Sequence, residues 1–320
     1  MSDEIARTKE HGAEATALGQ GGSEGRLETA RPPSKAAART KRIVGGIPMR
    51  LFILIIILVW TLPTLGLFVS SFRTRSAIAN SGWWTSVLQP FQENWTIANY
   101  DQVINADRMG TAFVNSLLVA IPSTVIPITI AAFAAYAIAW TNFPGREALF
   151  ILMVTLLVVP LQVALIPILR VYTSLQLNGT YIGIWLAHTG FGLPLATYIL
   201  YGYVSSIPKE IIESAHADGA TPWLMFTRLV LPLSVPAIAS FGIFQFLWVW
   251  NDLLVALVFL GTAPAKSVVT ARLSELVGSR GQDWHVLTAG AFLTMIMPLI
   301  VFFALQRYFV RGMMAGSVKG

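Results

Sequence analysis

A polar, amphipathic stretch between two apolar runs carries the arrangement of residues most suited to chemistry in this chain. Pro208 can begin a short helix, and Gly219 is expected to end it. Thr221 is a suitable N-cap for a second short helix. The carboxylate of Glu213 offers a charge to a basic group on a partner protein, and small residues beside it permit close approach. The stretch is therefore a candidate docking surface, although a segment that lies on lipid headgroups would show the same pattern.

The sequence contains no motif for nucleotide binding, metal binding or nucleophilic catalysis. The chain has no G-x-x-x-x-G-K-[ST] phosphate-binding loop, so we expect no ATP hydrolysis by this chain alone. Its 4 histidines lack metal-binding spacing, no G-x-S-x-G elbow occurs, and there is no cysteine to supply a thiolate. The sequence thus predicts no catalytic residue, no metal site and no cofactor held by this chain.

The runs on either side of the polar stretch are long enough to cross a membrane. Of the 320 residues, 55% are hydrophobic and 12% are charged, which is too apolar for a soluble domain. Since a helix rises ~1.5 Å per residue, about 20 uncharged residues span a hydrocarbon core of ~30 Å. The prediction is an all-α integral membrane protein with six transmembrane helices. The expected spans lie near 51–72, 111–140, 148–169, 181–206, 230–260 and 286–306.

An even number of spans places both termini on one side, and Lys and Arg indicate which side. With the N-terminus inside, the inner segments hold more of these residues than the outer ones, mainly through residues 1–48. Those residues are poor in aromatic and branched apolar side chains, which predicts a disordered cytoplasmic tail. The net charge of +6 indicates no nucleic-acid partner, because no basic stripe interleaved with aromatic residues lies outside the spans. We expect both termini in the cytoplasm.

A second polar group lies in the fifth apolar run. An ionised Asp252 would cost ~2.5–3.5 kcal/mol there on insertion scales, so it should face a cavity or a partner. Aromatic faces beside amide and carboxylate groups suit a carbohydrate, and Trp248, Trp250 and Asn251 are its neighbours in sequence. These four residues are candidates for lining a solute pathway. A polar cluster that packs helices together is the alternative.

The polar stretch resembles the EAA loop of ABC importer permeases. That loop combines a glutamate, small residues, a glycine and a later apolar group that ends in proline. The matching residues are Glu213, Ser214, Ala215, Ala217, Asp218, Gly219, Leu231 and Pro232. Ser214 replaces the usual alanine and Leu229 the usual isoleucine, and both changes conserve size.

The resemblance covers the chain from about residue 49 to its end. The stretches 142–146, 250–252 and 307–312 look like those of carbohydrate permeases of the maltose-importer type. The residues at 269–273 and 280–285 are similar to those of α-glucoside permeases.

The resemblance implies a type I ABC importer permease fold with a six-helix permease domain over 49–312 and cytoplasmic coupling helices at 208–228. Such a chain sits in the bacterial cytoplasmic (inner) membrane, surrounded by lipid, and forms half of the pathway of an ATP-driven importer of α-glucosides or oligosaccharides. A second permease, two ATPase subunits that bind ATP and Mg, and an extracytoplasmic sugar-binding protein are the implied partners. In the tail 313–320, Ala315, Gly316 and Ser317 would contact the ATPases.

An ion-coupled secondary transporter is the alternative function. It would use carboxylates within its spans and need no ATPase. Only Asp252 is available for that purpose, and no inverted repeat is evident.

Overall fold

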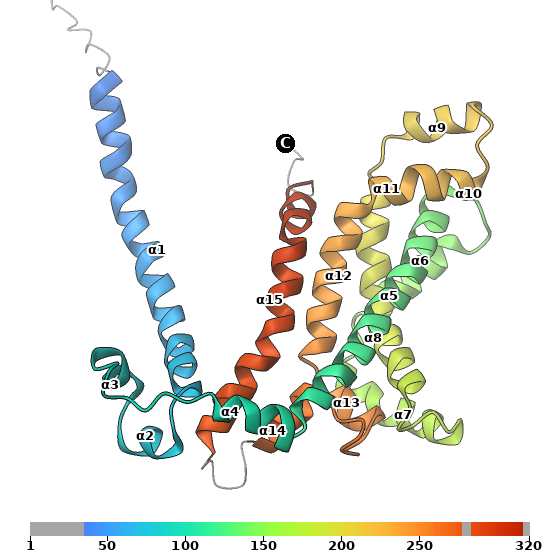
Figure 1. The fold of residues 1–320 in the computed structure, drawn as a ribbon. Coiled ribbons are helices and arrows are strands. Elements are labelled where there is room, and N and C mark those ends of the chain that lie inside the picture. Colours follow the sequence, from blue (N-terminus) through green and yellow to red (C-terminus); the bar gives the residue numbers. More distant parts are fainter. Residues whose placement is uncertain (1–34, 277–282, 316–320) are drawn as a thin grey trace, which may run out of the picture. The chain divides into compact units, whose positions relative to one another are not determined.

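The computed structural model describes residues 35–276 and 283–315, with side chains described over 48–276 and 283–307, and no strand element occurs in these ranges (Figure 1). Most of the tail expected over 1–48 lies outside the described residues. Helix α1 (Lys35–Ser71) already includes residues 35–48. Among the described residues, those up to Trp60 belong to one unit of the chain and those from Thr61 onward to another.

Four helices are long and apolar enough to cross a membrane. They agree with four predicted spans to within three residues at each end. These segments are Pro48–Ser71 of α1, α5 (Met109–Trp140), α8 (Tyr181–Val204) and Trp284–Arg307 of α15 (Trp284–Ala315).

The span predicted at 148–169 is broken. Helices α6 (Arg146–Leu156) and α7 (Leu161–Ser174) meet at an angle of 107°. Pro160 lies at the break, and its extended backbone angles interrupt the helical geometry. Proline also lacks the N–H that a continuing helix would use for a hydrogen bond.

The span predicted at 230–260 is divided as well. Helix α10 (Pro222–Met225), the π-helical turn η2 (Phe226–Val230) and α11 (Leu231–Leu233) together meet α12 (Val235–Trp250) at 69°. The described chain therefore has four candidate spans, or up to six if each bent pair is one span.

The remaining helices are short and connect the spans. They are α2 (Arg75–Asn80), α3 (Trp83–Leu88), α4 (Ala98–Asp101), the π-helical turn η1 (Gln102–Ala106), α9 (Lys209–Ala217), α13 (Leu254–Phe259) and α14 (Val269–Leu276).

Helix α5 is central to the packing of the second unit. It packs along α8 and α12, and α12 packs in turn on α15. The residues that α5 buries include Ala112, Ala120, Ala131 and Ala135, and small side chains allow helix backbones to approach closely in a membrane. Helices α5, α8 and α12 thus form the frame on which both candidate sites are built.

Candidate functional site

The polar stretch folds as a short helix, a tight turn and a second short helix. Helix α9 begins directly after Pro208 and ends at Ala217. Gly219 follows with φ of +79°, a conformation that L side chains rarely adopt. The side chain of Thr221 accepts a hydrogen bond from the Leu224 N–H (3.3 Å) and caps α10. The helix ends predicted from Pro208, Gly219 and Thr221 are confirmed.

Buried side chains fix this helix–turn–helix to the ends of α5 and α8. Ile212 of α9 is buried in a cluster with Leu200 of α8. Phe226 is buried in the same cluster and stacks on Phe133 of α5, with ring centroids 4.5 Å apart. The Tyr136 hydroxyl of α5 donates a hydrogen bond to the Pro222 carbonyl (3.0 Å). A force on α9 or α10 would therefore reach the long helices directly.

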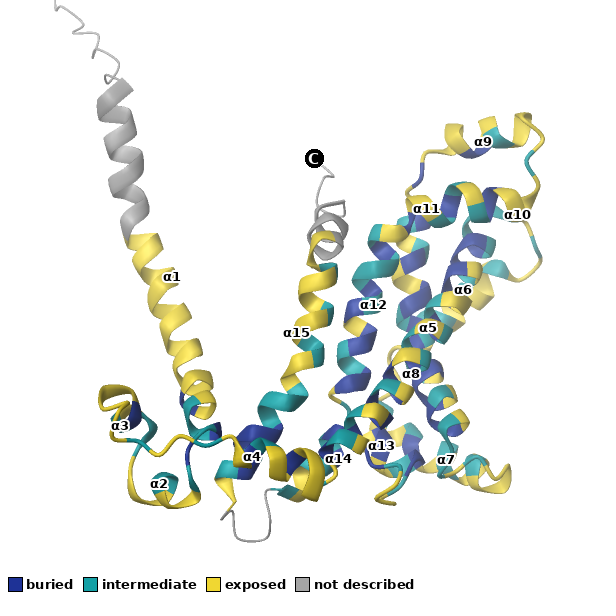
Figure 2. Ribbon diagram, in the orientation of Figure 1, coloured by how far each residue is buried: buried dark blue, intermediate teal, exposed yellow. Residues whose placement is uncertain are grey.

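The other face of the helix–turn–helix is exposed (Figure 2). The Glu213 side chain is 60% exposed and pairs with Lys209, with 2.9 Å between Oε1 and Nζ. The hydrogen bond and negative charge of Glu213 raise the pKa of Lys209. Of the other residues matched to the EAA loop, Ser214, Ala217, Asp218, Gly219 and Pro232 are exposed, whereas Ala215 and Leu231 are half-buried.

An exposed apolar side chain in this region was not predicted. Trp223 is 65% exposed, although its ring also stacks near Phe133 with centroids 6.1 Å apart. Leu224 beside it is 46% exposed. A tryptophan at the start of a short helix in a polar stretch was the signal that could have identified it. The exposed face therefore offers both charge and apolar contact to a partner.

The candidate pathway residues separate into different environments. Trp250 is only 2% exposed; its indole N–H donates to the Thr294 carbonyl (3.0 Å) and its rings pack against Phe113 and Phe246. Asn251 is exposed, and its side-chain amide donates to the Leu247 carbonyl (2.8 Å). Trp250 therefore packs in the core and does not line the cavity beside α12 to which Trp248 contributes.

Asp252 caps a helix. Its carboxylate accepts hydrogen bonds from the N–H groups of Val255 (3.3 Å) and Ala256 (2.9 Å) at the start of α13. The imidazole Nε2 of His188 lies 3.9 Å from the same carboxylate. The His188 ring is fully buried and meets Trp248 edge-on, with centroids 5.6 Å apart. Trp248, His188 and Asp252 are therefore one connected group at the end of α12.

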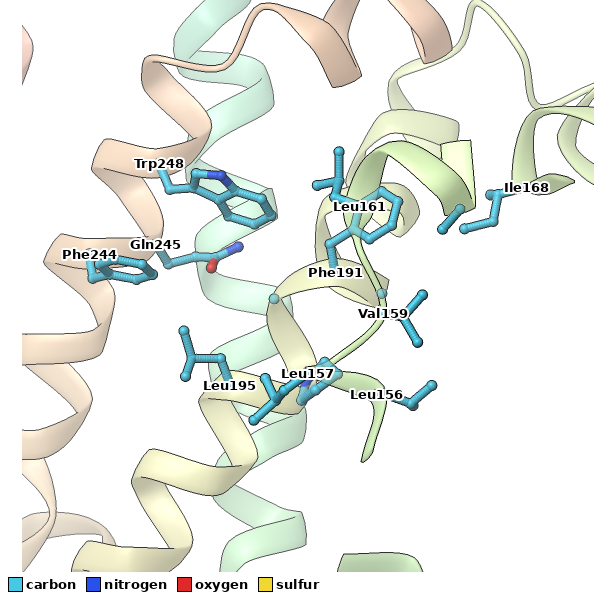
Figure 3. A pocket seen from close by; sticks show the side chains of 14 residues that line it. Leu156, Leu157, Val159, Leu161, Ile168, Phe191, Leu195, Phe244, Gln245 and Trp248 are labelled. Atoms are coloured by element: carbon cyan, nitrogen blue, oxygen red, sulfur yellow. The ribbon is translucent and has the colours of Figure 1, made fainter. Parts of the chain in front are cut away.

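Trp248 also lines a cavity of about 350 Å³ between the α6–α7 break, α8 and α12 (Figure 3). Gln245, one turn earlier on α12, lines it too and is fully buried. The Gln245 amide packs against Gly192 of α8, where an added Cβ would lie 2.6 Å from Nε2. Sequence reasoning missed Gln245, although a glutamine inside an apolar run is a visible signal.

Among the described residues, no group of three or more His, Cys, Asp or Glu side chains could hold a metal ion. The candidate functional features are the exposed helix–turn–helix and the cavity.

Long apolar helices and two bent helix pairs are features expected of a membrane permease. The chain belongs to the family described as "Binding-protein-dependent transport system inner membrane component", whose pattern matches residues 127–315. Its structure is similar to that of a bacterial ABC transporter involved in the import of the acidic polysaccharide alginate. The TM-score is 0.70 at 20% identity, covering 85% of this chain and 98% of that one. The predicted family and type I importer permease fold are confirmed.

Curated relatives align over most of their length. The chain is 60% identical to the osmoprotective compounds uptake permease protein GgtD of Synechocystis sp., over 85% of this chain and 92% of the relative. It is 44% identical to the alpha-glucoside transport system permease protein AglG of Rhizobium meliloti, over 85% of this chain and 97% of the relative.

Proposed function

We propose that this chain is one of two permease subunits of an ATP-driven importer of small carbohydrates, with α-glucosides as the first class to test. The exposed helix–turn–helix carries the proposal, because it is anchored to α5 and α8 and offers charge and apolar surface on its free side. The similarity to an alpha-glucoside permease and to a permease for osmoprotective compounds supports the choice of solute.

In this proposal, residues 208–228 dock on an ATPase subunit in the cytoplasm, and both termini lie on that side. ATP and Mg bind to two ATPase subunits and not to this chain. Closure of the ATPases moves the docked segment, and the long helices follow as a rigid body, which changes the side of the membrane to which the pathway opens. An extracytoplasmic binding protein delivers the sugar, and a second permease completes the pathway.

Purification of the tagged chain with its partners tests this function. We expect a second permease and two ATPase subunits in stoichiometric amounts. In proteoliposomes, uptake of trehalose, sucrose or maltose should require both ATP and the binding protein. Uptake by the chain alone, driven by an ion gradient, would instead establish the secondary-transporter alternative.

The C-terminal residues are proposed to contact the ATPase pair. Helix α15 continues to Ala315, while Gly316 and Ser317 lie outside the described residues. Truncation after Gly312 should lower sugar-stimulated ATP hydrolysis several-fold, because a contact through small residues would be lost while the spans remain. Stimulated hydrolysis is measured at equal membrane abundance. Normal hydrolysis and uptake in the truncated protein would show that the tail is a free chain end.

A second prediction separates two roles of Asp252. Asp252→Asn keeps an oxygen that can accept hydrogen bonds at the start of α13 but removes the charge. If the carboxylate also binds sugar hydroxyls, uptake should fall by about 10-fold or more, since a hydrogen bond to a charged group contributes about 1.5–3 kcal/mol. Asp252→Ala, which removes the cap as well, should also lower thermal stability. Normal uptake by Asp252→Asn would leave the residue as a helix cap only.

A further inference from the structure

The short helix α3 (Trp83–Leu88) exposes large apolar side chains along most of its length (Figure 2). Trp84, Val87 and Leu88 are spaced by three and four residues and so share one face of the helix. Phe91 lies in the turn directly after it. All four side chains are more than half exposed, and that of Phe91 is fully exposed. These four residues are called the α3 patch below.

A buried ion pair holds the opposite face of α3 in place. Ser86 is buried on that face, and its hydroxyl donates to the Glu93 carboxylate. The same carboxylate pairs with Arg73, with 3.3 Å between Oε2 and Nε, and the Arg73 side chain is buried. Arg73 also donates to the carbonyls of Ala77 (3.0 Å) and Ser81 (3.1 Å). Charge-assisted hydrogen bonds of this kind fix geometry, so the α3 patch is held outward by the fold.

Helix α3 also packs beside the last turns of the first candidate span. The Trp83 ring lies against Gly66, where an added Cβ would be 2.7 Å from Nε1. Gly66 precedes the end of the candidate span Pro48–Ser71 by about 7–8 Å along the helix axis. Farther along the loop, the Thr96 N–H donates to the Phe72 carbonyl (2.8 Å), directly after the span. The loop therefore folds back onto the end of a membrane helix.

The surface around α3 has almost no charge. From residue 76 to residue 100, Glu93 is the only charged residue, and it is paired with Arg73. The nearest exposed charge is Arg75 on α2, which pairs with Asp283 (3.6 Å). Tryptophan is enriched where membrane helices leave the hydrocarbon core, because its ring is apolar and its N–H is polar. An uncharged apolar face with a tryptophan suits that boundary.

A bilayer fits the α3 patch better than a protein partner does. A stable protein interface buries about 800 Å² on each partner, whereas a helix of six residues is only ~9 Å long. A partner that binds and leaves would also return Leu88 and Phe91 to water in every cycle. Lipid stays in contact throughout. On α1, Leu62 and Leu65 next to Gly66 are exposed as well, so apolar surface continues from the span to the helix packed on it.

From these observations we propose that α3 is a membrane-interface anchor. The α3 patch lies at the boundary between lipid headgroups and acyl chains, while the Arg73–Glu93 pair joins the anchor to the end of the first span. The depth of that span is then fixed by lipid contact as well as by its own length. The proposal concerns lipid and goes beyond the proposed import function.

Fluorescence quenching at single cysteines tests the anchor, because the chain has no cysteine of its own. Leu88→Cys places a thiol in the α3 patch, and Ser76→Cys places one on the exposed surface of α2 beside the Arg75–Asp283 pair. Both are labelled with bimane in the complete transporter, in vesicles of phosphatidylcholine and phosphatidylglycerol. Phosphatidylcholine with a nitroxide near the top of its acyl chain should quench the label at 88 about 2-fold or more above that at 76, since such faces enter the boundary by about 5–10 Å. Iodide in the water should show the opposite order.

A charge variant and its control identify the contributing face. Phe91→Glu, made in the chain labelled at 88, should lower quenching by the nitroxide lipid by about half or more, because a carboxylate resists entry into the boundary. Asn80→Glu adds the same charge on α2, outside the α3 patch, and should leave the quenching unchanged. If Phe91→Glu reduces membrane abundance, the comparison of positions 88 and 76 in the otherwise unchanged chain decides by itself.

Each contrary outcome assigns the α3 patch to a different surrounding. Equal iodide quenching at 88 and 76, without quenching by the nitroxide lipid, would place the patch in water and overturn the anchor. Protection of 88 from both quenchers would mean that the second permease covers it, which also overturns the anchor. Quenching by lipid that disappears when the extracytoplasmic binding protein is added would assign the patch to that protein instead. None of these readouts requires transport, so failure of the import function would leave the anchor standing.

Discussion

Glu213→Lys is expected to remove the ATPase subunits from the purified complex and to lower sugar-stimulated ATP hydrolysis by at least about 10-fold. The Glu213 side chain is 60% exposed, and its pair with Lys209 is of the surface type, which contributes less than about 1 kcal/mol. The fold should therefore survive the change. A like charge placed opposite a basic group of the partner costs several kcal/mol, so the loss should fall on docking.

A double variant provides the control for this prediction. Lys209→Glu combined with Glu213→Lys restores an ion pair within α9 but leaves the reversed charge at 213. ATPase recovery and stimulated hydrolysis should stay low in the double variant. Recovery of both would show that Glu213 acts through its pair with Lys209, and normal values in the single variant would contradict the docking role.

Gly183→Ala is expected to cause the largest loss of stability among single methyl additions to α8. The Gly183 N–H donates to the capping Thr180 side chain (3.0 Å), and an added Cβ would lie 2.2 Å from the Leu177 carbonyl oxygen. That oxygen belongs to the backbone, and the Gly179 N–H holds the same loop to the Phe259 carbonyl (2.8 Å). Relief of the clash must move backbone, so we expect a loss near the upper end of the ~1–3 kcal/mol typical of overpacking.

Thermal unfolding of the purified complex and membrane abundance measure this effect. Gly190→Ala is the matched control on the same helix, because a Cβ there meets no atom within 4 Å. That variant should be neutral or slightly more stable, since alanine favours helix over glycine by about 0.5–1 kcal/mol. Equal unfolding temperatures and equal membrane abundance of the two variants would contradict the predicted clash at Gly183.

The features that could be predicted from the sequence depend on local rules. Gly219 follows the end of α9 because glycine readily adopts the positive φ required there. Thr221 caps α10 because its hydroxyl can accept a hydrogen bond from a free N–H of the first turn, and the proline after it suits the first helical position. Both follow from a few neighbouring residues. The four unbroken spans were predictable for a similar reason, since length and apolar composition suffice.

The features that were missed depend on which face of a helix points inward. Helix α12 is apolar around its whole circumference, so no polar face shows that Trp250 packs in the core while Gln245 and Trp248 line the cavity. The break after Leu156 had no polar residue to mark it, and proline is common within unbroken membrane helices, as in α5 and α8. Both features depend on tertiary packing, which cannot be read from local patterns in a single sequence.

The length of α5 has a mechanical consequence. Near one end, Tyr136 bonds to the helix–turn–helix; near the other, the Asn115 side chain donates to the carbonyls of Ala265 (2.9 Å) and Ser267 (3.0 Å), in the connection before α14. The two attachments are 21 positions apart on one helix, or about 31 Å at ~1.5 Å per residue. If α5 pivots at one attachment as a stiff rod, a tilt of about 5° moves the other by about 3 Å. A shift of about 3 Å is larger than the variation in donor–acceptor distance that a hydrogen bond tolerates. In the proposed transport cycle, a small rotation of α5 at the helix–turn–helix would therefore make or break the hydrogen bonds of Asn115 near its other end.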